Sequence, residues 1–431
     1  MLKTIVSPLW YPYTQMKWAE KHHHVESAKG VYLHLSDGKE LIDAISSWWC
    51  VIHGYNHPRL NRAVTMQLEK MSHVMLGGLT HEPALKLAEK LVDITPKGLN
   101  HVFFSDSGSV GVEVALKMAI QYWWNQNERA KSKFLALKHA YHGDTTGAMS
   151  VGDPEESMHV LFSPLLPRHY FLDTPSGREG QIAETSKDIE KLEQFLKHHH
   201  QEIAAFILEP LVQCAGGFKM YSSEYLKSAR NLCDQYNILF IFDEVATGFG
   251  RTGTLFAADK AQVTPDIMIL GKGLTGGYTG LAATVATTGI FEAFFGNDLS
   301  RALMHGPTFT GNPLACAAAL ESTALFFEEA YLDKIAAIER QLATVLYPFH
   351  HPKVKETRVL GAIGVIEVYD PKDVEGIQEF AAERGVWLRP FGNIIYAMPP
   401  YIISQNELSQ IMDVMVSWFH KNKNNINKSY P

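Results

Sequence analysis

The chain has 431 residues, of which 46% are hydrophobic, and a formal net charge of −7 from 46 acidic and 39 basic residues. This length exceeds what one hydrophobic core usually supports, so we expect a large domain and a smaller one. The charged residues are scattered, and no long basic block is present that would bind the phosphates of nucleic acid. The composition is therefore typical of a globular protein that does not bind nucleic acid.

The cysteines and the N-terminus indicate a cytoplasmic protein. Four cysteines lie far apart and form no C-x-x-C pair, which fits neither a zinc site nor a disulfide framework: Cys50, Cys214, Cys233 and Cys316. The first residues, "MLKTIVSPLWYPYTQ", lack an apolar signal segment, and no apolar run approaches the length that spans a membrane. Two histidine triplets, at 22–24 and 198–200, are consecutive residues that rarely aim at one ion, so we predict no metal site.

In chain order, a hairpin-like stretch at 30–44 is followed by strand-like runs that alternate with helical patterns. The strand-like runs lie at 101–106, 133–138, 204–210, 238–244 and 265–271. Helical patterns opened by a serine are expected over 110–124 and 222–237. This alternation predicts a mostly parallel central sheet covered by helices on both faces. In such a sheet, ligands bind at the carboxyl ends of the strands.

The C-terminal part of the sequence lacks the regular alternation of strands and helices seen before it. Strand-like runs at 359–370 and 386–401 precede a final amphipathic helix that begins near residue 406. We interpret residues 59–330 as a large cofactor-binding domain and 331–431 as a smaller α/β domain. Residues 1–58 form an N-terminal segment that is expected to join the smaller one.

The stretch "ILGKGLTGG" at 269–277 allows two interpretations. Its G-x-G-x-x-G spacing matches a dinucleotide-binding loop, which needs a following helix and then a strand that ends in an acidic residue. Here the glycines lead to "YTGLAATVATTG", which reads as another strand and has no acid at its end. The dinucleotide interpretation is therefore disfavoured, and the lone Lys272 becomes the informative residue.

Three features suit one chemistry. Lys272 follows an apolar run, Asp243 ends the preceding one, and "SDSGS" at 105–109 lies between a strand and a helix. Free N–H groups and the dipole at a helix start bind phosphate. Pyridoxal phosphate requires a lysine as its covalent anchor, an acid beside its pyridine nitrogen and an anion cradle. The sequence therefore predicts a pyridoxal phosphate enzyme, although a solvated lysine is the ordinary alternative for Lys272 taken alone.

The chain resembles the class III, or omega, aminotransferases of pyridoxal phosphate fold type I. The resemblance runs over nearly the whole chain and rests on spaced motifs in order: "SGS", "AYHGDT", "ILEP", "FDEVATGFGRTG", "ILGKGLTGG" and "GPTFTGNPLACAAAL". Further stretches, "YPYTQM", "SSWWCVIHGYNHP", "MSHVMLGGLTH" and "LRPFGNIIYAMPPYII", resemble the branch of this class that serves biotin biosynthesis. The phosphate loop, "SGSVGVEVALK", departs from the form usual in the class, which disfavours ornithine, acetylornithine and 4-aminobutyrate as substrates.

The resemblance implies a role for each site residue. Lys272 would anchor the cofactor covalently and move protons, Asp243 would pair with the pyridine nitrogen, and Tyr141 would stack on the ring. Gly108 and Ser109 would hold the phosphate. The resemblance also implies that Pro307 and Thr308 contact the cofactor, with Thr308 coming from the other subunit of a homodimer. The implied substrate contacts are Tyr13, Trp48, Gly306 and Arg389. Of these, Arg389 would clamp a carboxylate. The implied reaction transfers the amino group of S-adenosyl-L-methionine to 8-amino-7-oxononanoate and gives 7,8-diaminononanoate.

Several alternatives stay open. Neighbouring residues of a strand point to opposite faces, so only one of Trp48 and Trp49 is expected to face the ligand, and the resemblance favours Trp48. Arg389 could instead pair with a structural acid, and Glu209 and Arg251 are interpreted as structural. At the level of function, the alternatives are another omega-aminotransferase or an aminomutase, an enzyme that takes its nitrogen from lysine, and a binding protein without turnover.

Overall fold

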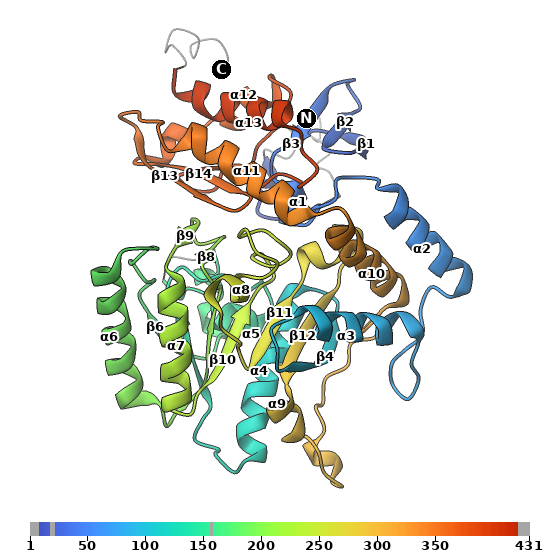
Figure 1. Cartoon of the computed structure of the whole chain (residues 1–431), viewed down its shortest axis with the longest axis vertical. Helices are drawn as coiled ribbons and strands as arrows, with labels where there is room; N and C mark the ends of the chain where they lie inside the picture. Colours follow the sequence, from blue (N-terminus) through green and yellow to red (C-terminus); the bar gives the residue numbers. More distant parts are fainter. Residues whose placement is uncertain (1–7, 18–21, 156–157, 421–431) are drawn as a thin grey trace, which may run out of the picture.

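The computed structural model describes residues 8–17, 22–155 and 158–420, and its largest element is a seven-stranded sheet (Figure 1). In spatial order its strands are β4 (Leu99–Ser105), β12 (Ala282–Thr287), β11 (Ile267–Leu270), β10 (Leu239–Asp243), β7 (Ile203–Leu208), β5 (Lys133–Leu137) and β6 (Tyr170–Leu172). β12 is antiparallel to both of its neighbours, and the other neighbouring pairs are parallel. The mostly parallel central sheet predicted from the sequence is confirmed.

Helices cover both faces of this sheet. All residues of β10 are buried, and successive side chains enter two different cores, Phe240 and Phe242 one and Ile241 the other. Because successive side chains of a strand point to opposite faces, both faces of the sheet are buried. The core that contains Ile241 is covered by α4 (Gly108–Asn125), and the other core takes residues from α6 (Ile182–His199) and α7 (Ser223–Gln235).

Both predicted helices begin at a serine cap, although α4 starts at Gly108, two residues before the expected position. The Ser107 hydroxyl accepts a hydrogen bond from the Val110 N–H at 3.3 Å and caps α4. In the same way, the Ser222 hydroxyl accepts from the Tyr225 N–H at 3.3 Å and caps α7. Each cap satisfies a backbone donor that has no partner inside the helix.

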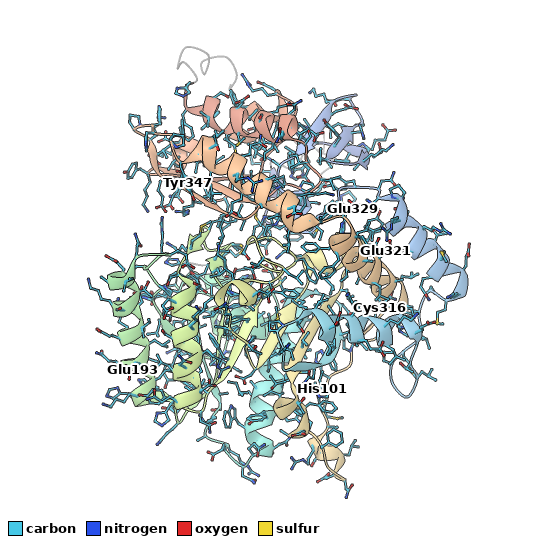
Figure 2. The ribbon with its side chains drawn as sticks, in the orientation of Figure 1. His101, Glu193, Cys316, Glu321, Glu329 and Tyr347 are labelled. Atoms are coloured by element: carbon cyan, nitrogen blue, oxygen red, sulfur yellow. The ribbon has the colours of Figure 1, made fainter. Side chains whose placement is uncertain are left out.

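Three further helices lie at the β4 end of the sheet: α2 (Pro58–Lys70), α3 (Glu82–Ile94) and α10 (Pro313–Glu328). Arg59 of α2 donates to Glu321 of α10 at 2.5 Å, and Figure 2 labels Glu321 on the side of α10 that lies near α2. Short helices α5 (Thr146–Ser150), α8 (Ala257–Ala261) and α9 (Thr288–Glu292) complete this part of the chain. A two-stranded ribbon, β8 (Val212–Gln213) and β9 (Lys219–Met220), follows β7.

Two smaller sheets lie together beyond one edge of the central sheet (Figure 1). One is antiparallel and contains β13 (Val354–Leu360), β14 (Ile363–Val368) and β16 (Ile394–Ala397). The other contains β1 (Val25–Lys29), β2 (Tyr32–Leu35), β3 (Glu40–Asp43) and β15 (Val386–Trp387). The accompanying helices are α11 (Tyr331–Leu346), α12 (Ile377–Ala382) and α13 (Gln405–Ser417).

The pairing of these strands joins the two ends of the chain. β2 and β3 form the antiparallel hairpin predicted at 30–44, and β3 pairs in parallel with β15, more than 300 residues later in the chain. N-terminal and C-terminal residues therefore share one sheet. The domain limits 1–58, 59–330 and 331–431 stay a prediction.

The segment around Lys272 does not fold like a dinucleotide fingerprint. β11 is followed by a single 3₁₀ turn, Lys272–Thr275, and then by the antiparallel strand β12. A dinucleotide-binding loop would lead into a long helix at this point. Within the ranges given above, no helix combines the length and the hydrophobicity that crossing a membrane requires.

Candidate active site

A cavity of about 660 Å³ lies at the carboxyl edge of the central sheet. It brings together five of the predicted site residues: Tyr13, Trp48, Tyr141, Lys272 and Arg389. Its wall also contains residues that sequence reasoning did not assign to the site, among them Trp49, Asp144, Phe218, Phe391 and Tyr396. These residues come from the N-terminal segment, from the loops after strands of the central sheet and from the C-terminal part of the chain.

Lys272 lies two residues beyond the end of β11 and has a positive φ of 43°. Its Nζ lies 4.9 Å from the centroid of the Trp49 ring. No carboxylate in the described part of the chain forms an ion pair with this amine, and no hydrogen-bond partner is found there either. The amine is therefore available to a ligand in the cavity.

A chain of buried hydrogen bonds stabilises the turn that contains Lys272. The Ser322 hydroxyl donates to the Gly273 carbonyl at 3.2 Å, and His53 Nε2 lies 2.8 Å from the same hydroxyl. The Tyr331 hydroxyl lies 2.9 Å from His53 Nδ1. Because Ser322 uses its proton on Gly273, His53 donates from Nε2 and accepts from Tyr331 at Nδ1, which requires a neutral imidazole. Burial lowers the pKa of His53 to about 3, in agreement with this neutral form.

Asp243 is the last residue of β10 and lies beside Ile269 of β11, so it and Lys272 reach the same edge of the sheet. His142 Nδ1–H donates to Asp243 Oδ2 at 2.7 Å, and the Val245 N–H donates to Oδ1 at 3.1 Å. The side chains of His142 and Asp243 are 0% and 6% exposed. This burial explains why the carboxylate needs fixed donors, since an unpaired buried charge is strongly destabilising.

Glu209, interpreted from the sequence as structural, ties together two segments of the cavity wall. It follows β7, and its carboxylate accepts from the Tyr141 N–H at 3.1 Å and from the Cys214 N–H at 3.0 Å. Tyr141 and Cys214 both line the cavity. Burial raises the pKa of Glu209 to about 7.

The predicted anion cradle lies at the start of α4, beside the lysine segment. A Cβ atom placed on Gly271 would lie 3.8 Å from Gly108 Cα, and one placed on Gly108 would come within 2.8 Å of a Val245 methyl group. Ser109 Oγ accepts from the Thr145 N–H at 3.0 Å. Gly108 and Ser109 are not part of the wall of the 660 Å³ cavity itself. They stand at a helix N-terminus, where an anion is favoured.

Gly306, Pro307 and Thr308 are not brought into the cavity of their own chain. Gly306 and Thr308 are exposed, in a loop that precedes α10, and Pro307 is half-buried. The next residue, Phe309, is 56% exposed and lies against His73, with 4.8 Å between ring centroids. The expectation that Gly306 lines the substrate pocket is thus not met within one chain.

Both tryptophans line the cavity, so the expectation that only one does so is wrong. The premise of strand geometry fails because Ser46–Trp49 (α1) forms a tight turn whose residues all have positive φ. This turn is held by buried Asp43, which accepts from the Ile45 and Ser47 N–H groups at 2.9 and 2.7 Å. In addition, the Ser46 hydroxyl donates to the Met398 carbonyl at 2.7 Å.

Arg389 is not paired with an acid: no carboxylate of the described residues forms an ion pair with it. Its guanidinium carbon lies instead 4.4 Å from the centroid of the Trp48 ring. Burial lowers the pKa of Arg389. A cation that stacks on an aromatic ring keeps its N–H donors free for a carboxylate ligand.

Asp144 supplies the cavity with a carboxylate. Its Oδ2 accepts from the Tyr13 hydroxyl at 2.6 Å, and its Oδ1 lies 2.8 Å from His159 Nε2. The hydrogen bond from His159 lowers the pKa of Asp144. Burial, followed by the hydrogen bond to Asp144, raises the pKa of Tyr13 to about 12, so the phenol stays protonated. Asp144 is thus an anion that faces the same cavity as Arg389.

Sequence signals existed for only some of the missed residues. His142 and Asp144 belong to "AYHGD", directly after a strand end, where ligand-binding residues gather. Phe218 and Tyr396 gave no such signal, because their rings meet only in the folded chain, with centroids 4.7 Å apart.

Comparison with known proteins identifies the family to which this chain is similar. A model of the family described as aminotransferase class-III matches residues 14–419. A relative from Buchnera aphidicola subsp. Schizaphis graminum, named adenosylmethionine-8-amino-7-oxononanoate aminotransferase, is 46% identical over 408 residues, which cover 94% of each chain.

Two solved structures are similar along nearly the whole chain. An enzyme of that same name from Methanocaldococcus jannaschii superposes with a TM-score of 0.88 at 37% identity, covering 96% of this chain and 97% of the other. An amine transaminase from an uncultivated Pseudomonas species, in its PLP-bound form, gives a TM-score of 0.90 at 32% identity, covering 96% and 98%.

Proposed function

Because the chain belongs to the class III aminotransferases, enzymes of fold type I that use pyridoxal phosphate, we propose that it transfers the amino group of S-adenosyl-L-methionine to 8-amino-7-oxononanoate. The product would be 7,8-diaminononanoate, a biotin precursor. The names of the relatives from Buchnera and Methanocaldococcus support this choice within the family.

The residues present fit pyridoxal phosphate. Lys272 offers an amine without an ion pair in the described part of the chain, Asp243 offers a buried carboxylate on the neighbouring strand, and the start of α4 lies beside the lysine segment. We assign Lys272 as the covalent anchor, Asp243 as the partner of the pyridine nitrogen, and Gly108 with Ser109 as the phosphate cradle. When bound, the cofactor stores the amino group between donor and acceptor and delocalises the electrons of the reacting carbon.

The chain's own groups then hold and move protons. Lys272 Nζ would be the group that moves protons, taking one from the substrate carbon and delivering it to the cofactor carbon with the donor, and working in the reverse direction with the acceptor. Asp243 would pair with the ring nitrogen, and the hydrogen bond from His142 fixes the orientation of its carboxylate. Tyr141 is proposed to cover the cofactor ring and to exclude water from it.

The observation that carries the substrate proposal is the pair of opposite charges in one aromatic cavity. Arg389 and Asp144 both line it, together with Tyr13, Trp48 and Trp49. The proposed acceptor has a carboxylate at one end and an amine at the other, so each charge has a partner. The sulfonium group of the donor is attracted to aromatic faces, and its adenine ring is flat enough to stack on them.

Asp144 also favours a second candidate donor. Lysine as a donor would need a carboxylate to bind its second amine, and Asp144 provides one inside the cavity. Lysine as the source of nitrogen is therefore the alternative that this structure supports.

We further propose a homodimer in the cytoplasm, in which Gly306, Pro307 and Thr308 complete the partner's site. In support, the surface near this loop exposes large apolar side chains, with Met75 58%, Leu79 53% and Phe309 56% exposed. Exposed apolar surface of this kind is typical of interfaces between subunits.

Full turnover with labelled donor tests the proposal. The purified enzyme, saturated with pyridoxal phosphate, is incubated with 8-amino-7-oxononanoate and S-adenosyl-L-methionine that carries an isotopic label in its amino group. Mass spectrometry should find the label in 7,8-diaminononanoate. Labelled product formed only when labelled lysine is supplied would shift the assignment to the second candidate, and no product with either donor would refute the acceptor.

A further inference from the structure

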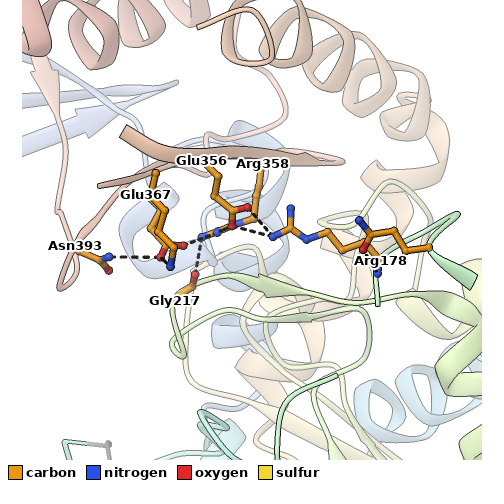
Figure 3. A network of polar contacts seen from close by, with 8 residues as sticks. Arg178, Gly217, Glu356, Arg358, Glu367 and Asn393 are labelled. Atoms are coloured by element: carbon orange, nitrogen blue, oxygen red, sulfur yellow. Dashed lines mark hydrogen bonds and ion pairs between the residues drawn. The ribbon is translucent and has the colours of Figure 1, made fainter. Parts of the chain in front are cut away.

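Arg358 of β13 stands at the centre of a partly buried polar network that joins the C-terminal sheet to the cavity loops (Figure 3). The residue is 4% exposed. Its guanidinium donates to Glu367 Oε2 at 2.5 Å and to the Gly217 carbonyl at 2.9 Å, and it also contacts Glu356. Arg178 donates to both oxygens of Glu356, at 2.8 and 2.7 Å. Each acid in the network therefore has more than one cationic or polar partner.

The Gly217 carbonyl belongs to a loop that forms part of the wall of the 660 Å³ cavity. Residues 214–218 connect β8 to β9, and Cys214, Ala215 and Phe218 of this loop line the cavity. The Phe218 ring packs against Trp49, with 5.9 Å between ring centroids. The loop also lies close to the backbone at His139: a Cβ atom placed on Gly216 would lie 2.0 Å from the His139 carbonyl oxygen.

A second branch of the network reaches the turn that follows Arg389. Asn393 Nδ2 donates to the Val368 carbonyl at 2.8 Å and lies 3.5 Å from Glu367 Oε1. The Val368 N–H donates back to the Asn393 carbonyl at 3.0 Å. The turn 390–392, between Arg389 and Asn393, lines the cavity. Strand β14 thus holds this turn while Arg358 of β13 holds the facing loop.

We propose that Arg358 is a positioning residue for substrate recognition, because it fixes the distance between loop 214–218 and the turn at 390–393. Lys272 and Asp243 stand on the central sheet, and within the described residues neither has a hydrogen bond or ion pair to the network. Loss of Arg358 therefore widens or loosens the substrate side of the cavity and leaves the cofactor side in place. This inference rests on the proposed aminotransferase function.

The test compares Arg358→Leu and Arg358→Lys with a matched control, Lys355→Ala. Lys355 pairs with Glu367 from the exposed side at 2.7 Å and, among the residues described, has no hydrogen bond to loop 214–218. In single-turnover reactions, Arg358→Leu should raise the apparent dissociation constants of donor and acceptor about tenfold and change the maximal rate by less than about threefold. Its cofactor absorption should match that of wild type. Arg358→Lys should recover part of the affinity, since an ammonium group still donates hydrogen bonds, and Lys355→Ala should behave as wild type.

Two outcomes would overturn the role. One is a folded Arg358→Leu protein with unchanged dissociation constants, and the other is a loss of maximal rate and cofactor absorption at unchanged dissociation constants. If Arg358→Leu does not fold, Asn393→Ala releases the opposite side of the cavity without exposing a buried charge and must show the same loss of affinity. Wild-type enzyme measured in parallel separates the two claims, because failure of wild type to convert the substrates refutes the proposed function and not the role of Arg358.

Discussion

His142 donates its Nδ1–H to Asp243 across 2.7 Å, and this contact joins the loop after β5 to the end of β10. The proposed cofactor partner is therefore held by a side chain from the loop that follows another strand of the same sheet, and the imidazole is itself buried. The proton at Nδ1 fixes the orientation of the Asp243 carboxylate.

Asp243→Asn should bind some cofactor and lose most turnover, because a neutral amide does not keep the ring nitrogen protonated. His142→Leu should lower the rate by about 10-fold to 100-fold, the loss expected for one hydrogen bond to a charged group. His142→Asn, whose Nδ2 can take the place of Nδ1, serves as the control and should lie nearer wild type. Rates of single turnover measure all three, and wild-type rates in Asp243→Asn would contradict the assigned role.

Lys272→Ala should abolish the visible absorption that arises from the covalent bond between Lys272 and the cofactor, with the fold retained. The reason is that Lys272 brings an amine into the cavity, and the preceding residue, Gly271, lies beside Gly108 of the cradle. Borohydride reduction of the native enzyme, followed by peptide mapping, locates the modified lysine. A pyridoxyl group found on a different lysine would refute the anchor assignment.

Arg389→Ala should weaken the acceptor half-reaction by about 1.5–3 kcal/mol, the contribution of a hydrogen bond to a charged group. The donor half-reaction should suffer less, since the proposed clamp binds the carboxylate of the acceptor. Arg389→Lys keeps the charge and loses the two-pronged geometry, so it should recover only part of the effect. Equal losses in both half-reactions would indicate that the stacking of Arg389 on Trp48 is structural.

The free energy of unfolding should decrease at acidic pH in part because of His53. The unfolded chain protonates this histidine below its ordinary pKa of 6.5, whereas burial lowers the pKa in the folded chain to about 3. Between these values the unfolded state binds more protons, so the free energy of unfolding falls as the pH is lowered. His53→Gln removes this titration, and its free energy of unfolding should fall less steeply than that of wild type, by up to about 1.4 kcal/mol per pH unit. Denaturant unfolding of both proteins at pH 6 and pH 5 makes the comparison, and parallel losses would contradict it.

The sequence predicted the parts of the site that depend on strand ends. Asp243 and Lys272 each follow a buried apolar run, and parallel strands bring such ends to one edge, so their proximity follows from periodicity alone. The presence of a serine-capped helix after β4 followed from local capping preferences, although α4 begins at Gly108, two residues before the expected start.

The rest depends on contacts between distant residues. Trp48 and Trp49 both line the cavity because they belong to a turn of positive φ that Asp43 and the Met398 carbonyl stabilise. Strand geometry could not predict this turn. Phe218 reaches the cavity because Arg358 holds the adjoining carbonyl from 141 residues away. No local pattern encodes such tertiary hydrogen bonds.

The identity of the amino donor tests the account most directly. S-adenosyl-L-methionine and lysine are each mixed with the enzyme in its pyridoxal phosphate form, without acceptor, and the visible absorption of the lysine-bound cofactor is followed. We predict that S-adenosyl-L-methionine discharges this absorption and that later addition of 8-amino-7-oxononanoate restores it. Discharge by lysine with no response to S-adenosyl-L-methionine would contradict the donor assignment and leave the aminotransferase family intact.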